Sequence, residues 1–312
     1  MRRRTIFMGS PDFAVPTLEA LLRTEDVIAV VTQPDKPKGR GQALQPPPVK
    51  VTALRAGVPV LQPDRLGGER GAAARAELAA LAPELIVVAA YGKILPQAIL
   101  DIPPRGCINV HGSLLPRYRG AAPIQWAVIR GERETGITIM RMDAGMDTGA
   151  MLLKGSVPIT DDDTAGTVEA KLAPLGADLL LTALARIEEG ELPAEPQDPA
   201  LATLAPRLTK DDGRVDFSRS AREVRDLVRG VDPWPGAFTL LKGERLALFA
   251  PRLVSGAGAP GAVLGADRDG LLVACGDGVV AFRELQAPGR KRLPAHAFLA
   301  GRPVAPGTVL GA

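Results

Sequence analysis

The chain has 312 residues, of which 46% are hydrophobic, and its formal net charge is +3. This length predicts two domains, and the hydrophobic fraction is high enough for buried cores, which excludes a disordered protein. No apolar run approaches the length that spans a membrane, and the basic start at residues 1–5 precedes too short an apolar stretch for a secretory signal, so we expect a cytoplasmic protein.

The first half of the chain alternates between strand-like and helix-like patterns. Apolar runs predict strands at residues 5–8, 27–31, 85–90, 107–111, 136–141 and 151–154. Helical spacing predicts helices at residues 11–22, 72–81, 123–131 and 164–189, with a kink or break at Pro174. This order predicts an α/β fold with a doubly wound, mostly parallel Rossmann-like sheet. The loop after the first strand lacks the glycine pattern of dinucleotide-binding proteins, which argues against such a cofactor.

Residues 33–50 are rich in proline and glycine and carry Lys36, Lys38 and Arg40 with one acid, Asp35. We expect a loop without regular structure here, because glycine and proline disfavour both helices and strands. Loops of this length in compact domains are usually functional or disordered. The alternative is a solvated surface loop with no ligand.

Residues 106–149 hold side chains that are rare in this sequence. Asn109 is the only asparagine, and His111 is one of two histidines. On a strand, side chains two residues apart share a face, so Asn109 and His111 point into the same space where the strand ends. Asp147 follows the next predicted strand and is the favoured carboxylate partner. The alternatives are a turn-forming asparagine, a hydrogen-bonded structural histidine and a turn aspartate.

An amide, an imidazole and a carboxylate suit acyl transfer to an amine. Asn109 would donate to the carbonyl oxygen as it gains negative charge. His111 would donate to the same oxygen or move a proton between the two nitrogens, while Asp147 fixes its tautomer and stabilises its cationic form. This chemistry needs no serine or cysteine nucleophile. Cys107 and Cys275 lie in apolar runs and are expected to be buried thiols, and no zinc-type spacing occurs, so we expect no metal.

The second half begins after a proline-rich segment at residues 191–206, which predicts a linker between a domain at 1–190 and another at 207–312. Ser220 and Glu223 predict a capping box, and the helix that follows carries one arginine stripe: Arg222, Arg225 and Arg229. Short strand-like runs between glycine turns then predict a small β-barrel. Residues 207–312 contain 16 Lys and Arg and 11 Asp and Glu, a net charge of +5 that suits a polyanionic partner. An ordinary arginine-rich surface is the alternative.

Several motifs resemble those of the folate-dependent formyltransferases over nearly the whole chain. They lie at residues 8–13 (MGSPDF), 33–41 (QPDKPKGRG), 46–50 (PPPVK), 109–111 (NVH), 113–116 (SLLP), 119–124 (RGAAPI), 143–149 (DAGMDTG), 208–212 (LTKDD) and 232–236 (DPWPG). They are most similar to members that act on methionyl initiator tRNA, and the tails of the second half match more loosely.

The resemblance implies a fold, substrates and site residues. Asn109, His111 and Asp147 would carry formyl transfer from 10-formyltetrahydrofolate to the α-amine of methionyl initiator tRNA. The folate site would be bordered by Ser113, Leu114, Leu115, Pro116 and Tyr91. The second domain would be OB-like. Lysines and arginines would contact tRNA, namely Lys38, Arg40, Lys210, Arg222, Arg225 and Arg229. We expect a monomer.

Three alternatives remain open. The acceptor could be a small amine such as an amino sugar or glycinamide ribonucleotide, or it could be water, which would make the protein a formyltetrahydrofolate hydrolase. A non-catalytic nucleic-acid-binding module would leave Asn109, His111 and Asp147 without a role.

Overall fold

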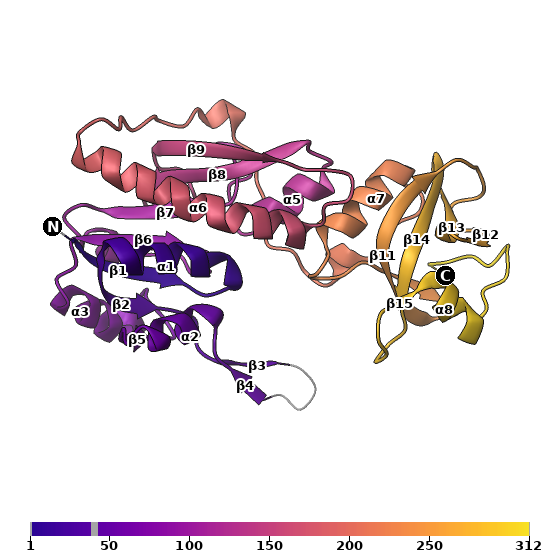
Figure 1. The fold of residues 1–312 in the computed structure, drawn as a ribbon, viewed down its shortest axis with the longest axis horizontal. Helices are drawn as coiled ribbons and strands as arrows, with labels where there is room; N and C mark the ends of the chain where they lie inside the picture. The colour runs from indigo at the N-terminus through magenta and orange to yellow at the C-terminus, as the bar shows by residue number, and fades with distance from the viewer. Residues whose placement is uncertain (1, 39–42, 312) are drawn as a thin grey trace. The chain divides into compact units, whose positions relative to one another are not determined.

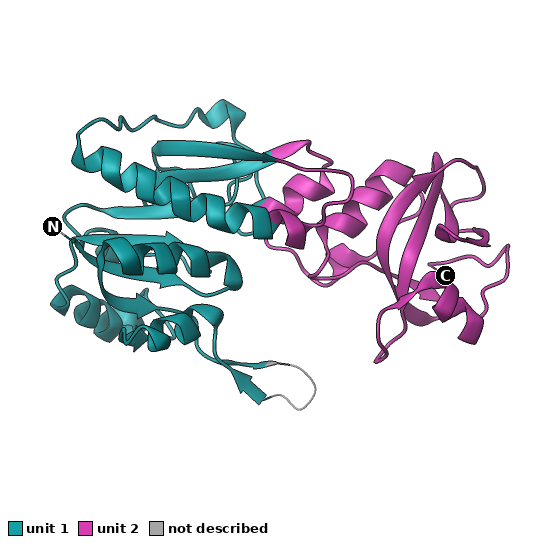
Figure 2. Cartoon of the chain, viewed as in Figure 1, with its two compact units in different colours: residues 1–123, 135–157, 169–206 teal, residues 124–134, 158–168, 207–312 magenta. Residues whose placement is uncertain are grey.

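The computed structural model describes residues 2–38 and 43–311, which form two compact units (Figure 2). Unit 1 comprises residues 1–123, 135–157 and 169–206, and unit 2 comprises residues 124–134, 158–168 and 207–312. Each predicted domain is one continuous stretch of sequence, whereas each of these units combines three segments that contact one another. Residues 191–206, which we predicted to be a linker, therefore belong to unit 1, and two segments of the first half belong to unit 2.

Unit 1 is built on a seven-stranded sheet with the order β5-β2-β1-β6-β7-β8-β9 (Figure 1). The strands are β1 (Arg4–Gly9), β2 (Asp26–Val31), β5 (Val60–Leu61), β6 (Leu85–Ala89), β7 (Cys107–His111), β8 (Glu134–Arg141) and β9 (Met151–Pro158). The pairs from β5 to β7 are parallel, and β7 pairs antiparallel with β8. This confirms the predicted Rossmann-like sheet. Strand β6 is apolar and buried along its whole length, as expected for a central strand with both faces covered.

The four helices predicted in the first part of the chain are present, and the described residues contain further helices between them. The helices of this part are η1 (Asp12–Ala14), α1 (Val15–Thr24), α2 (Pro48–Arg55), η2 (Glu69–Gly71), α3 (Ala72–Ala80), α4 (Gln97–Leu100), α5 (Pro123–Ile129), α6 (Ala165–Glu188) and η3 (Pro199–Leu201). The expected break at Pro174 is wrong, because α6 continues through it. Within the described residues, no helix combines the length and apolar character that a bilayer span needs.

The expectation of an irregular loop at residues 33–50 is also wrong. Strands β3 (Lys36–Lys38) and β4 (Ala43–Gln45) pair antiparallel, and α2 begins at Pro48. Proline at the first turn of a helix costs no hydrogen bond, because the amide hydrogens there have no partner within the helix. One of the prolines that suggested a loop, Pro48, is therefore the first residue of α2.

Unit 2 contains an antiparallel sheet of six strands with the order β10-β11-β14-β13-β12, and β15 pairs with β14. Its strands are β10 (Phe238–Leu241), β11 (Glu244–Val254), β12 (Val263–Asp267), β13 (Gly270–Cys275), β14 (Gly278–Gln286) and β15 (Leu293–Pro294). The other elements are η4 (Asp211–Gly213), α7 (Ala221–Gly230) and α8 (Ala295–Gly301). This sheet is compatible with the predicted small barrel. The capping box between Ser220 and Glu223 and the burial of both cysteines are confirmed.

Candidate active site

Asn109 and His111 lie on the last residues of β7, where the strand reaches the carboxyl edge of the sheet. The strand pairs with β8 through Asn109 opposite Met140 and His111 opposite Thr138. Both side chains are largely buried, with 9% of Asn109 and 5% of His111 exposed. Buried polar groups need partners, so their contacts indicate what the site can do.

Asp147 approaches both side chains from the loop between β8 and β9. Asn109 Nδ2 lies 3.5 Å from Asp147 Oδ1, and His111 Nδ1 lies 3.7 Å from Asp147 Oδ2. The backbone N–H of Gly120 donates to Oδ2 at 2.9 Å. Asp147 has a φ of 54°, in the left-handed region that a non-glycine residue seldom adopts. The structure thus brings together the three side chains that the sequence singled out.

The other imidazole nitrogen of His111 determines its tautomer. Nε2 lies 3.0 Å from the carbonyl oxygen of Tyr118, and a carbonyl oxygen can only accept, so Nε2 carries a hydrogen. In neutral His111 the lone pair is then on Nδ1, which faces Asp147. We predicted that Asp147 would fix the tautomer, and this is wrong: the Tyr118 carbonyl fixes it, while Asp147 faces the nitrogen that gains a proton.

Gln197 holds the Asp147 loop in place, although sequence reasoning placed it in a linker. Its side-chain amide donates to the backbone oxygens of Asp147 at 2.8 Å and Gly149 at 2.7 Å, and its own oxygen accepts from Arg119 Nε at 2.9 Å. Only 9% of Gln197 is exposed. The segment around Gln197 therefore forms part of the support of the site. A polar side chain between prolines gave no sequence signal of this role.

The four residues predicted to border a folate site form a tight corner after β7. Ser113 Oγ donates to the carbonyl of Arg117 at 2.6 Å, and the N–H of Leu115 donates to Thr138 Oγ1 at 3.0 Å. Ser113 and Leu115 are buried, whereas Leu114 and Pro116 are partly exposed. Of the four, Leu114 and Pro116 therefore retain surface that a ligand could touch.

Tyr91, which was predicted to border the folate site, has a buried side chain in this structure. Only 2% of it is exposed, and it packs in an apolar core cluster with Leu95, Ile99 and Cys107. Within the described part of the chain its hydroxyl has no hydrogen-bond partner. Burial raises the pKa of Tyr91 from 10.0 to about 12. The buried hydroxyl of Tyr91 therefore lowers the stability of the folded state.

We expect the Tyr91→Phe variant to be more stable than the wild type at pH 7 by about 1 kcal/mol, because it removes a buried hydroxyl without a partner. The wild type should also lose stability between pH values of about 10 and about 12, since the unfolded chain releases the phenol proton first. The Tyr91→Phe variant should not show the part of this fall in stability that comes from ionisation of Tyr91. Urea unfolding followed by circular dichroism at pH 7 and at alkaline pH measures both effects. A variant less stable at pH 7 would mean that the hydroxyl has a partner.

The predicted tRNA contacts differ widely in exposure. Lys210 and Arg222 are exposed. Arg225 and Arg229, which were predicted to contact tRNA, are 8% and 4% exposed, so little of either side chain is open to a ligand in this structure. Arg225 Nη2 lies 2.8 Å from Asp226 Oδ1, and Arg229 Nη1 donates to the carbonyls of Thr160 and Asp161 at 3.0 and 2.8 Å. Arg40 lies outside the described residues, and Lys38 is described only as the last residue of β3.

Metal ligands do not cluster in the part of the chain that the structure describes. Over residues 2–38 and 43–311 no group of three or more His, Cys, Asp or Glu side chains is arranged to hold an ion. The groups that converge at Asn109, His111 and Asp147 are a hydrogen-bond donor, a proton acceptor and a carboxylate. Such a set can stabilise a developing oxyanion and move a proton.

Known formyltransferases match this chain over most of its length. Residues 3–184 match the formyl transferase family model, and residues 207–303 match the model of the formyl transferase C-terminal domain. A methionyl-tRNA formyltransferase from Citrifermentans bemidjiense is 53% identical over 99% of this chain and 96% of its own length. Another from Desulfotalea psychrophila is 55% identical over 98% and 95%.

Solved structures show the same fold at low identity. The N-formyltransferase from Helicobacter canadensis, in complex with folinic acid and dTDP-3-aminofucose, has a TM-score of 0.69 and 18% identity over 90% of this chain and 99% of that one. HypX from Aquifex aeolicus in complex with tetrahydrofolic acid has a TM-score of 0.63 and 19% identity over 96% and 47%. These structural similarities support the fold, and the relatives matched over nearly their full length at more than 50% identity establish the family. The chain belongs to the methionyl-tRNA formyltransferase family.

Proposed function

We propose that this chain transfers the formyl group of 10-formyltetrahydrofolate to the α-amine of methionyl initiator tRNA, and that Asn109, His111 and Asp147 carry the reaction. The observation that supports this proposal most strongly is the convergence of Asn109 Nδ2 and His111 Nδ1 on one carboxylate, at 3.5 and 3.7 Å. Both atoms lie at the carboxyl edge of the sheet, where ligands bind in open α/β folds.

In the proposed reaction the amine attacks the formyl carbon, and negative charge develops on the formyl oxygen. The Asn109 amide supplies a fixed donor for that oxygen, which stabilises the transition state more than the ground state. The N–H of the attacking amine passes its proton to His111 Nδ1, the nitrogen that the Tyr118 contact leaves free. His111 then returns this proton to the departing N10 of the folate.

The Asp147 carboxylate and the Tyr118 carbonyl would stabilise the positive charge of protonated His111. When Nδ1 accepts a proton, the imidazolium donates on one side to the Tyr118 carbonyl and faces the Asp147 carboxylate on the other. The positive charge therefore forms between two acceptors. An α-amine titrates near pH 8, so part of it is already neutral at pH 7 and the base need only take the proton that is released on attack.

The relatives and the charge distribution support tRNA as the acceptor. The relatives at 53% to 55% identity, matched over nearly their whole length, bear the name methionyl-tRNA formyltransferase. Residues 207–312 carry a net charge of +5, and Lys210 and Arg222 in this part are exposed. A positive surface favours a polyanion such as tRNA over a small acceptor with few phosphates.

Product analysis tests this function. The wild type is incubated with 10-formyltetrahydrofolate and one acceptor: methionyl initiator tRNA, methionyl elongator tRNA, an amino sugar nucleotide, glycinamide ribonucleotide or water alone. We expect N-formylmethionine on the initiator tRNA as the main product. Efficient formylation of a small amine, or release of formate at the same rate without an acceptor, would contradict the proposal.

We expect the Gln197→Ala variant to lower kcat by about 10- to 100-fold, because a shift of the catalytic groups by about 1 Å costs this much. The variant removes the two hydrogen bonds that hold the backbone of Asp147 and Gly149. The KM for the folate donor should change little. Gln97→Ala, which removes an exposed amide on α4, is the matched control. Equal kcat values for the two variants would remove Gln197 from the support of the site.

A further inference from the structure

The backbone on either side of Tyr118 is held by one residue from a distant part of unit 1, Thr203. Thr203 Oγ1 accepts from the N–H of Tyr118 at 2.9 Å, and the carbonyl oxygen of Thr203 accepts from the N–H of Arg119 at 2.8 Å. The Tyr118 carbonyl between these two amides lies 3.0 Å from His111 Nε2. Resting on the proposed function, we infer that Thr203 is a positioning residue that fixes the His111 imidazole through the backbone of Tyr118.

The peptide between Tyr118 and Arg119 gives the first argument. A trans peptide is planar, so its N–H and its C=O point in opposite directions. The N–H of this peptide donates to Thr203, and its oxygen lies against His111 Nε2 on the other side. The peptide plane therefore joins Thr203 to the imidazole, and a rotation of the plane would change both contacts at once.

Tyr118 adopts a backbone conformation that needs support. Its φ is 61°, in the left-handed region where residues other than glycine are disfavoured. The hydroxyl of Thr203 holds the amide before this bend, and the carbonyl of Thr203 holds the amide after it. Both dihedral angles of Tyr118 are therefore restrained by one residue. Without the hydroxyl, the left-handed conformation loses one of these two restraints.

The segment at residues 203–205 also contacts the turn that holds Asp147. The N–H of Ala205 donates to the carbonyl of Arg119 at 2.7 Å. The next residue, Gly120, donates its N–H to Asp147 Oδ2, and a Cβ atom at Gly120 would lie 2.6 Å from the oxygen of Ala205. This approach leaves no room for a side chain, so the segment and the turn pack backbone against backbone. The same segment therefore restrains both hydrogen-bonding groups that flank the imidazole.

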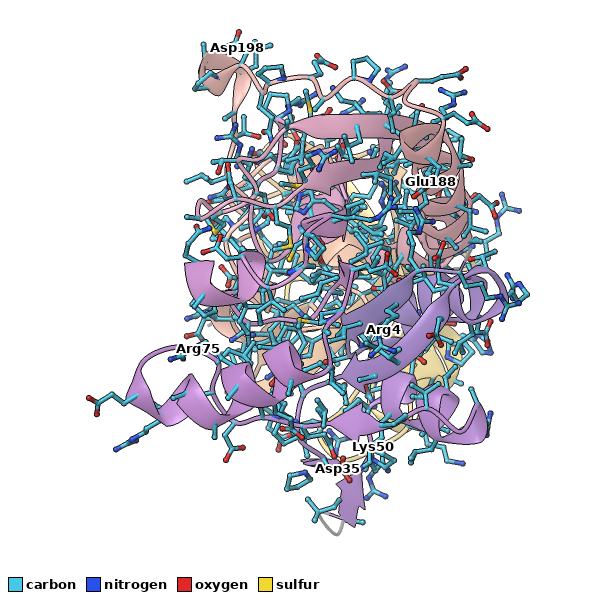
Figure 3. The ribbon with its side chains drawn as sticks, turned by 90° about the vertical axis from the view of Figure 1, so that its left-hand side faces the viewer. Arg4, Asp35, Lys50, Arg75, Glu188 and Asp198 are labelled. Carbon is cyan, nitrogen blue, oxygen red and sulfur yellow. The ribbon has the colours of Figure 1, made fainter. Side chains whose placement is uncertain are left out.

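The chain that leads to Thr203 is itself held in place. Gln197 is buried and donates two hydrogen bonds to the loop between β8 and β9. The Asp198 carboxylate then caps η3 by accepting from the N–H of Ala200 at 2.9 Å, and Figure 3 shows Asp198 at this turn. Thr203 follows η3 by two residues. Its hydroxyl therefore projects from a segment with hydrogen bonds of its own, which can keep that hydroxyl at a fixed position.

The proposed reaction depends on the orientation that Thr203 maintains. His111 Nδ1 takes the proton of the attacking amine, and it can do so because Nε2 donates to the Tyr118 carbonyl. If that carbonyl turned away, the imidazole could rotate or change its tautomer, and the proton acceptor would leave its place. Thr203 acts through Tyr118 and not on the substrates, so its loss should lower kcat rather than weaken binding.

The Thr203→Val variant removes the hydroxyl and keeps the shape of the side chain. We expect its kcat for formylation of methionyl-tRNA to fall by about 10- to 100-fold, with the KM for either substrate changed by less than about threefold. Thr203→Ser keeps a hydroxyl and should have a kcat within about threefold of the wild type. Thr182→Val, at an exposed position of α6, is the matched control. Equal kcat values for Thr203→Val and the control would overturn the inference, as would a rise in both KM values without a fall in kcat.

Exchange of the imidazole N–H with water tests the position of His111 without turnover. The chain has two histidines and His296 is exposed, so a slowly exchanging imidazole N–H in protein labelled with ¹⁵N-histidine belongs to His111. We expect this N–H to exchange about 10-fold faster in Thr203→Val than in the wild type, Thr203→Ser and the Thr182→Val control. Thr203→Ala, which removes the same hydroxyl, is used if Thr203→Val does not fold. Equal exchange rates would overturn the inference, whereas a failure of the proposed function would appear in the formylation assay of the wild type.

Discussion

Replacing Asn109 by alanine is expected to lower kcat by about 100- to 1,000-fold, because a fixed donor to a developing oxyanion is worth about 2.7 to 4 kcal/mol. Asn109 Nδ2 lies beside His111 and Asp147 at the end of β7, where it can meet the formyl oxygen. The donor stabilises charge that appears only on attack, so KM values should change much less than kcat.

Steady-state formylation of methionyl-tRNA measures this effect. Gln97→Ala, which removes an exposed amide on α4, controls for the loss of an amide elsewhere in unit 1. Circular dichroism must show that the Asn109→Ala variant is folded. A folded variant with kcat within a few-fold of the wild type would show that Asn109 is a structural residue of the strand end.

Replacing Asp226 by alanine is expected to lower the free energy of unfolding of unit 2 by about 3 to 5 kcal/mol, because removing one partner of a buried ion pair leaves the other charge buried. Asp226 is 3% exposed and lies 2.8 Å from Arg225 Nη2. Burial raises the pKa of Asp226, although Arg225 acts in the opposite direction, and burial lowers the pKa of Arg229. The cluster therefore costs energy to bury, and each charge depends on the others.

Asp216→Ala is the matched control for Asp226→Ala. Asp216 pairs with Arg219 at 3.8 Å, but more than half of each side chain is exposed, so its loss should cost at most about 1 kcal/mol. Both tryptophans, Trp126 and Trp234, belong to unit 2, so tryptophan fluorescence during urea unfolding reports on this unit. Similar losses for the two variants would contradict the role assigned to the buried cluster.

Local rules predicted much of the fold. The alternation of side chains along a strand predicts that Asn109 and His111 share one face, and the apolar run from Leu85 to Ala89 predicts a strand, which lies in the middle of the sheet. The capping box at Ser220 follows from two residues three apart. These predictions succeed because each depends on neighbours in the chain.

The errors concern contacts between distant segments. The sequence predicts that Arg225 and Arg229 of α7 contact tRNA, but residues 160 and 161 cover both side chains, and no pattern within α7 reveals that segment. Gln197 reaches Asp147 from fifty residues away. The tautomer of His111 depends on a backbone carbonyl, which every residue has, so the residue types in the sequence could not identify Tyr118.

In the proposed reaction the imidazole on β7 moves the proton while a formyl group passes from a folate to methionyl-tRNA. Single-turnover formylation tests it most directly, with the enzyme in excess over methionyl initiator tRNA and saturating 10-formyltetrahydrofolate, comparing the wild type with His111→Ala. The wild type should form N-formylmethionyl-tRNA in a single exponential phase, and the rate should be about 100- to 10,000-fold lower in the variant, with tRNA binding unchanged. A folded variant that forms this product at the wild-type rate would contradict it.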